Sequence, residues 1–72
     1  MADPMAWTMV RRGWRVLNRS GEQIGRVSEV MGDQEADIFN GLLVETGLLH
    51  GSEYIPSEQV AAIREGEVRV DR

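Results

Sequence analysis

Turn-forming residues divide this chain into short segments, and that division limits what it can fold into. A polar turn at residues 18–22, a polar loop at 32–37 and the glycine pair Gly47 and Gly51 separate segments rich in strand-forming residues. Gly21 can adopt the positive φ that a short hairpin loop requires. Short apolar segments joined by tight turns predict a mainly β protein.

The segment 38–47 predicts a central strand. Its apolar residues fall on both parities, Ile38, Leu42 and Val44 on one and Phe39 and Leu43 on the other. We therefore expect side chains to cover both faces of this strand. Further strands are expected at residues 13–17, 52–55 and 66–72, the last because Val68 and Val70 alternate with charged residues.

The segment 22–33 has two interpretations. Its apolar residues, Ile24, Val27, Val30 and Met31, fall at helical spacing. The internal Gly25, the hairpin turn before it and its short length favour a strand instead. A bulge at Gly25 would then bring Ile24 and Val27 to the same face.

Pro56 predicts the end of one element and the start of another. Proline has no N–H to donate to a strand ladder, and Ser57 after it is a good helix N-cap. Val60, Ala61 and Ile63 form an apolar stripe, so we expect a two-turn helix over residues 57–63. The fold predicted is a small, bent sheet or barrel of five or six strands with one short helical turn.

The chain is short enough that its core must be thin. A domain of 72 residues hides only about 60% of the surface of its unfolded chain. No cysteine is present to form a disulfide or a metal cluster, so self-association, most simply as a homodimer, is the expected source of further burial.

The first residues predict a cytoplasmic protein. Asp3 and Pro4 precede any apolar run and the arginines follow it, which is the reverse of the order in a secretory signal. No segment approaches the roughly 18 apolar residues that cross a bilayer.

The residues that could carry chemistry are few, and we expect no enzyme. His50 is the single histidine, and no serine lies in a nucleophile-elbow context. We predict no catalytic residue, no cofactor and no metal ligand.

An acidic loop offers a possible cation site. Asp33, Glu35 and Asp37 have the spacing of the first calcium-loop ligands, but Ile38 and Val44 stand where that loop needs glycine and glutamate. A solvated loop is the favoured interpretation, and binding of a divalent cation or small ligand is an alternative.

Charge is unevenly distributed along the chain, whose net charge is −4. Residues 1–30 carry five arginines and three acids, whereas residues 31–72 carry three arginines and nine acids. The overall sign disfavours nucleic acid as a partner. An RNA-processing or ribosome-associated role remains an alternative, with contacts from Arg11, Arg12, Arg15 and Arg19.

Three stretches, in order, resemble the PRC-barrel family. They are GWRVLNRSGEQIGRVSEV, FNGLLVETG and YIPSEQVAAIREGEVRV. Their isoleucine-glycine-x-valine, glycine-leucine-x-valine and isoleucine-proline-x-x-x-valine motifs are similar to those of this small β-barrel domain, which occurs in the photosynthetic reaction centre H subunit and in the ribosomal small-subunit maturation factor. The resemblance covers residues 13–70. It implies a non-catalytic module for protein assembly, at times around RNA-processing machinery.

Apolar residues outside the strand pattern are the candidate partner-binding residues. They are Trp7, Met9, Leu48 and Leu49. The first two lie in an N-terminal extension, residues 1–12, which precedes the barrel domain of residues 13–72. Trp7 either packs on its own barrel or contacts a second chain, because tryptophan is enriched at interface hot spots.

Overall fold

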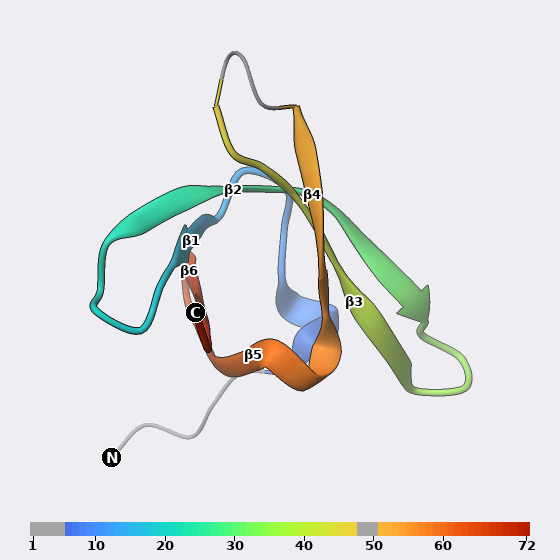
Figure 1. Cartoon of the computed structure of the whole chain (residues 1–72). Helices are drawn as coiled ribbons and strands as arrows, with labels where there is room; N and C mark the ends of the chain where they lie inside the picture. Colours follow the sequence, from blue (N-terminus) through green and yellow to red (C-terminus); the bar gives the residue numbers. More distant parts are fainter. Residues whose placement is uncertain (1–5, 48–50) are drawn as a thin grey trace.

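The described part of the chain forms one mixed sheet of six strands (Figure 1). The computed structural model describes residues 6–47 and 51–72. The elements are η1 (Trp7–Met9), β1 (Arg15–Leu17), β2 (Gln23–Asp33), β3 (Ile38–Glu45), β4 (Ser52–Pro56), η2 (Ser57–Gln59), β5 (Val60–Arg64) and β6 (Glu67–Val70). Their order across the sheet is β4-β3-β2-β1-β6-β5, and the pairs are antiparallel except β1 with β6. The predicted fold class, mainly β with five or six strands in a bent sheet, is confirmed.

The long strand β2 bends the sheet, because it pairs with β1 at one end and with β3 at the other. The strand interpretation of residues 22–33 is therefore correct. A bulge interrupts the pairing with β1, but its extra residue is Ile24, one position before the predicted Gly25. Gly25 has a different role. A Cβ atom there would meet the Glu45 carbonyl oxygen and lie 2.7 Å from Val44 Cγ1, so a glycine allows β2 to lie against the end of β3.

The helix predicted over residues 57–63 is wrong beyond its first turn. Only η2, Ser57–Gln59, is helical; its N-cap is Pro56, and no side chain caps it. The Ser57 hydroxyl donates to Glu58 Oε1 at 3.3 Å instead. Val60–Arg64 is the strand β5, which pairs with β6 through Ile63 opposite Val68. A helix this short is marginal in water, whereas a strand satisfies the backbone groups of β6 and buries Ile63.

The core lies inside the curled sheet and draws on every strand. Its buried residues are Val10, Val16, Val27, Leu42, Val44, Ile55, Ile63, Val68 and Val70. Val10 precedes β1, so the N-terminal segment contributes to the core. In the described residues no helix is long and apolar enough to cross a membrane.

Ile38 does not share the core face with Leu42 and Val44, as its parity had predicted. It is 52% exposed, whereas the other two are fully buried. The cause is a bulge in β3: Met31 pairs with Gly41 but Gly32 pairs with Phe39, which leaves Asn40 as an extra residue. One extra residue reverses which face the preceding side chains occupy. Phe39 consequently packs against the core, and Ile38 faces outward.

Candidate interaction surface

Strand register places several apolar side chains on the side of the sheet that faces away from the core. Leu42, Val44 and Ile55 face inward and are fully buried. Residues that alternate with them point the other way, because successive side chains of a strand point to opposite faces. On β3 and β4 these are Leu43 and Tyr54, which are register partners. On β2, Met31 lies opposite Gly41.

We call this surface the outer face and define it by Met31, Ile38, Leu43 and Tyr54. Three of its four side chains are well exposed: Met31 by 38%, Tyr54 by 47% and Ile38 by 52%. Leu43 is half-buried and does not belong to the core cluster or to the residues packed against it. Large apolar side chains gathered on an exposed sheet face mark a contact surface more specifically than single exposed residues do.

Gly41 allows Tyr54 to lie across the outer face. A Cβ atom at position 41 would lie 2.8 Å from the Tyr54 ring carbon Cζ and 2.8 Å from its hydroxyl oxygen. The same hydroxyl donates to the Asn40 carbonyl oxygen at 2.8 Å. Tyr54 is therefore held in one position, and a groove of about 490 Å³ runs beside it between Met31, Pro56 and Glu58.

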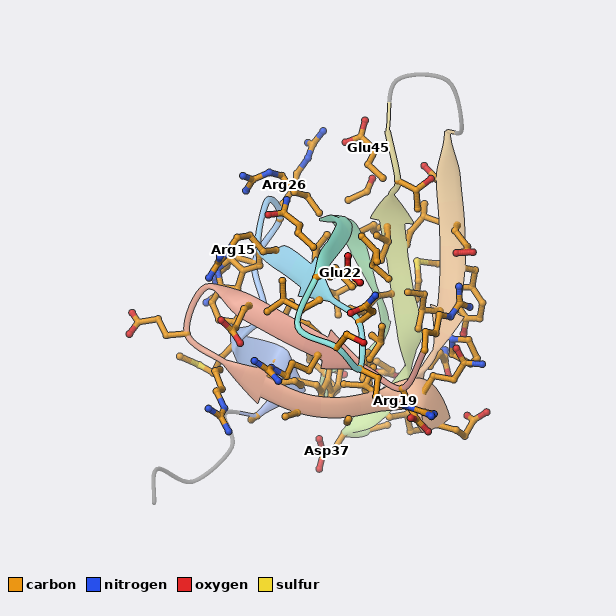
Figure 2. The ribbon with its side chains drawn as sticks, turned by 60° about the vertical axis from the view of Figure 1, so that its left-hand side comes forward. Arg15, Arg19, Glu22, Arg26, Asp37 and Glu45 are labelled. Carbon is orange, nitrogen blue, oxygen red and sulfur yellow. The ribbon has the colours of Figure 1, made fainter. Side chains whose placement is uncertain are left out.

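Carboxylates surround these apolar residues. Glu29 is the register partner of Leu43, and Asp33 is the register partner of Ile38. Glu45 ends β3 on the same parity as Leu43, and Glu58 belongs to η2 at the groove. All four are exposed. Arg26 is a nearby cation, and it is the register partner of Glu45 (Figure 2). Its guanidinium donates to the Gly13 carbonyl oxygen at 2.8 Å.

Trp7 packs on its own chain. Its ring stacks on Phe39 with centroids 5.3 Å apart and an interplanar angle of 9°. Its indole nitrogen Nε1 donates to Asp37 Oδ1 at 2.9 Å. These contacts agree with the expectation that Trp7 packs on its own barrel. Its contact with a second chain stays a prediction. Met9, at the end of η1, is 45% exposed.

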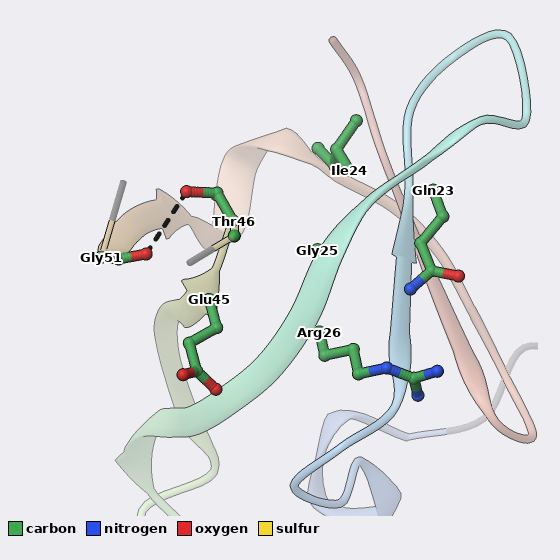
Figure 3. Close-up of a pocket in the computed structure, with 8 residues that line it drawn as sticks. Gln23, Ile24, Gly25, Arg26, Glu45, Thr46 and Gly51 are labelled. Atoms are coloured by element: carbon green, nitrogen blue, oxygen red, sulfur yellow. Dashed lines mark hydrogen bonds between the residues drawn. The ribbon is translucent and has the colours of Figure 1, made fainter. Parts of the chain in front are cut away.

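Leu48, Leu49 and His50 lie outside the described residues. Next to them, Gly47 and Gly51 border a second groove, of about 560 Å³ (Figure 3). Two hydrogen bonds link the lining residues Thr46 and Gly51: the Thr46 backbone N–H and hydroxyl both donate to the Gly51 carbonyl oxygen, at 3.1 and 3.3 Å. In Figure 3 the Arg26 side chain extends away from Thr46 and Gly51.

Three of the four arginines suggested for RNA contact are engaged within the chain. Arg15 pairs with Glu67 at 3.2 Å, and Arg19 Nε donates to Asp71 at 3.0 Å. Arg11 donates to the Thr8 carbonyl oxygen at 2.9 Å. These contacts set carboxylates beside two of the cations. RNA binding through this group remains a prediction with reduced electrostatic support.

The acidic loop residues serve as local hydrogen-bond acceptors. Asp33 Oδ1 accepts from the backbone N–H groups of Glu35 and Ala36, at 3.0 and 3.3 Å, and Asp37 accepts from Trp7. Over the described ranges, no three acidic or histidine side chains come close enough together to hold a metal ion. The arrangement is that of a closed turn with solvated carboxylates.

None of the four outer-face residues was predicted from the sequence as a contact residue. The available signal was the second apolar parity of the central strand, Phe39 and Leu43, which predicts a strand covered on both faces. In the structure Leu43 lies on the outer face beside the exposed Tyr54 instead. The bulge at Asn40 then exchanges Ile38 for Phe39 between those faces, and nothing in the local sequence requires it.

Comparison with known proteins supports the architecture. The family model described as the PRC-barrel domain matches residues 12–72 of this chain. The search of curated proteins found no match to this chain.

Proposed function

The chain belongs to the PRC-barrel family, and from that premise we propose that it is a non-enzymatic module that binds another polypeptide through the outer face. The proposal assigns no catalytic residue and no cofactor. It places the contact on Met31, Ile38, Leu43 and Tyr54, with the cytoplasm as the expected location.

The observation that carries this proposal is the contrast between neighbouring residues of β3. Leu42 is fully buried in the core, whereas Leu43 is half-buried outside that core, beside the 47% exposed Tyr54. An aromatic residue held rigidly by a hydrogen bond loses little conformational entropy when a partner packs on it. Apolar residues concentrated on a sheet face support binding, and the described residues contain no group of three or more acidic, histidine or cysteine side chains that could hold a metal ion.

Self-association remains part of the proposal, and we assign it to a surface other than the outer face. Met9 on η1 is exposed and belongs to the residues expected to meet a second copy. Sedimentation equilibrium over a range of concentrations gives the oligomeric state. A monomer at all concentrations, for both the wild type and Met9→Ser, would remove the dimer from the proposal and leave the outer face untouched.

Site-specific photocrosslinking tests the proposed function. Tyr54 is replaced by p-benzoylphenylalanine, which keeps an aromatic ring on the outer face, and the full chain is produced in cells of its source organism. We expect discrete crosslinked bands that mass spectrometry identifies as this chain joined to another polypeptide. The matched control places the same group at Glu65, an exposed turn residue between β5 and β6.

The position dependence decides the outcome. Crosslinks at position 54 that are absent at position 65 support the outer face as a binding surface. Equal labelling at both positions, or no polypeptide adduct at position 54, would contradict the proposed function.

A further inference from the structure

We propose that the outer face binds a polypeptide segment that combines basic and apolar side chains. This inference rests on the proposed function and adds the chemistry of the partner. Its basis is the charge around the apolar residues, which is negative on three separate elements.

The four carboxylates surround the apolar residues on more than one side. Glu29 and Asp33 lie along β2, Glu45 lies at the end of β3, and Glu58 lies on η2 at the groove. Neighbouring strands are about 4.8 Å apart, and successive residues on a strand about 3.3 Å. Neighbouring carboxylates therefore lie within about one to two Debye lengths of each other at 0.1 M salt, so their potentials add over the apolar centre.

These four carboxylates have no salt-bridge partner among the described residues. Glu53, Glu67 and Asp71 are each paired with an arginine. None of Glu29, Asp33, Glu45 and Glu58 forms such a pair within residues 6–47 and 51–72. Negative charge thus exceeds positive charge around the apolar residues of the outer face, where Arg26 lies opposite Glu45 and donates to the Gly13 carbonyl oxygen.

This charge selects among possible occupants. A nucleic acid would bring phosphates against the carboxylates, which disfavours it. A second copy of this chain, with its net charge of −4, would bring the same four carboxylates against themselves in a symmetric contact. Lysine or arginine side chains would pair with the carboxylates, while apolar side chains would pack on Leu43 and Tyr54 and enter the groove beside Met31.

Fluorescence anisotropy with defined peptides tests this inference. The probe is a labelled peptide of about ten residues with alternating lysine and leucine, long enough to span the face when extended. Two further peptides replace lysine by glutamate or leucine by serine. We expect binding of the lysine–leucine peptide that weakens when salt rises from about 0.05 to 0.5 M, and much weaker binding of the other two.

Two double variants with the same change of net charge separate local from overall attraction. Glu29→Lys with Glu58→Lys reverses two charges at the outer face, and Glu22→Lys with Glu65→Lys reverses two in exposed turn segments elsewhere. We expect the first to weaken binding by roughly ten-fold and the second by less than about three-fold. Thermal melting confirms that both remain folded.

Each contrary result overturns the inference in a distinct way. Equal weakening by the two double variants would show attraction to net charge alone. If the glutamate–leucine peptide binds as tightly as the lysine–leucine peptide, basic side chains are not required in the partner. If the lysine–serine peptide binds as tightly, apolar side chains are not required. Each of these results is compatible with successful crosslinking at position 54. The chemistry of the partner can therefore be refuted while the proposed function stands.

Discussion

Truncating two adjacent leucines should have very different effects on stability. Leu42 is fully buried in the core, between its register partners Val30 and Ile55. Its neighbour Leu43 points to the outer face. Leu42→Ala removes core side-chain volume and leaves a cavity, at a cost of about 2–5 kcal/mol. Leu43→Ala leaves no enclosed cavity, and we expect a cost below about 1 kcal/mol.

The size of the protein makes this difference easy to measure. A chain of 72 residues has a total stability of about 4–11 kcal/mol. The loss at position 42 therefore removes about half of it, and it lowers Tm by about 8–40 °C because 1 kcal/mol corresponds to roughly 4–8 °C at this size.

Urea denaturation followed by tryptophan fluorescence, with thermal melting by circular dichroism, gives both quantities. Trp7 and Trp14 both pack against the core and report its loss. Unchanged m-values would confirm that the two variants unfold from the same compact state. If Leu43→Ala costs as much as Leu42→Ala, the assignment of the two faces of β3 is refuted.

Two further substitutions test contacts outside the core. Trp7→Phe keeps the stacking on Phe39 but removes the donor to Asp37, so the free energy of unfolding should fall by about 0.5–1.5 kcal/mol in urea titrations; a neutral result would mean that this hydrogen bond does not hold the N-terminal segment. Ser57→Ala should change the free energy of unfolding by less than about 0.5 kcal/mol, because no side chain caps η2; a loss of 1 kcal/mol or more, typical of a true N-cap, would restore the helix predicted over residues 57–63.

Turns and strands were predictable wherever one local signal dominated. The glycine-containing turn at 18–22 and the end of a strand at Pro56 follow from residue chemistry alone, and the observed strands fall close to the predicted ones. The polar loop predicted over 32–37 is a turn at 34–37, because β2 extends to Asp33. The secondary structure of residues 60–64 is determined by pairing with β6 and not by the intrinsic propensity of the segment. Val60 and Ile63 suit a helix face and a strand equally well, and it is the presence of β6 beside them that makes the strand more favourable.

The outer face was harder to predict, because it depends on contacts between residues of different strands. The bulge at Asn40 arises where β3 pairs with β2, and it determines that Ile38 faces outward. Tyr54 becomes a surface residue through its fit over Gly41, which belongs to another strand. The acidic surroundings likewise combine residues of β2, β3 and η2 that are not adjacent in the sequence.

The parallel pairing of β1 with β6 has a consequence for the order of folding. Arg15–Leu17 pairs with Glu67, Val68 and Arg69, near the opposite ends of the described chain. Such contacts have high contact order, so the conformational entropy of the intervening loop must be lost before they form. A nascent chain that already contains β1–β4 still lacks Val68 and Val70 of the core. During translation, the exposed apolar surface of this domain should therefore stay accessible to chaperones until β6 has been synthesised.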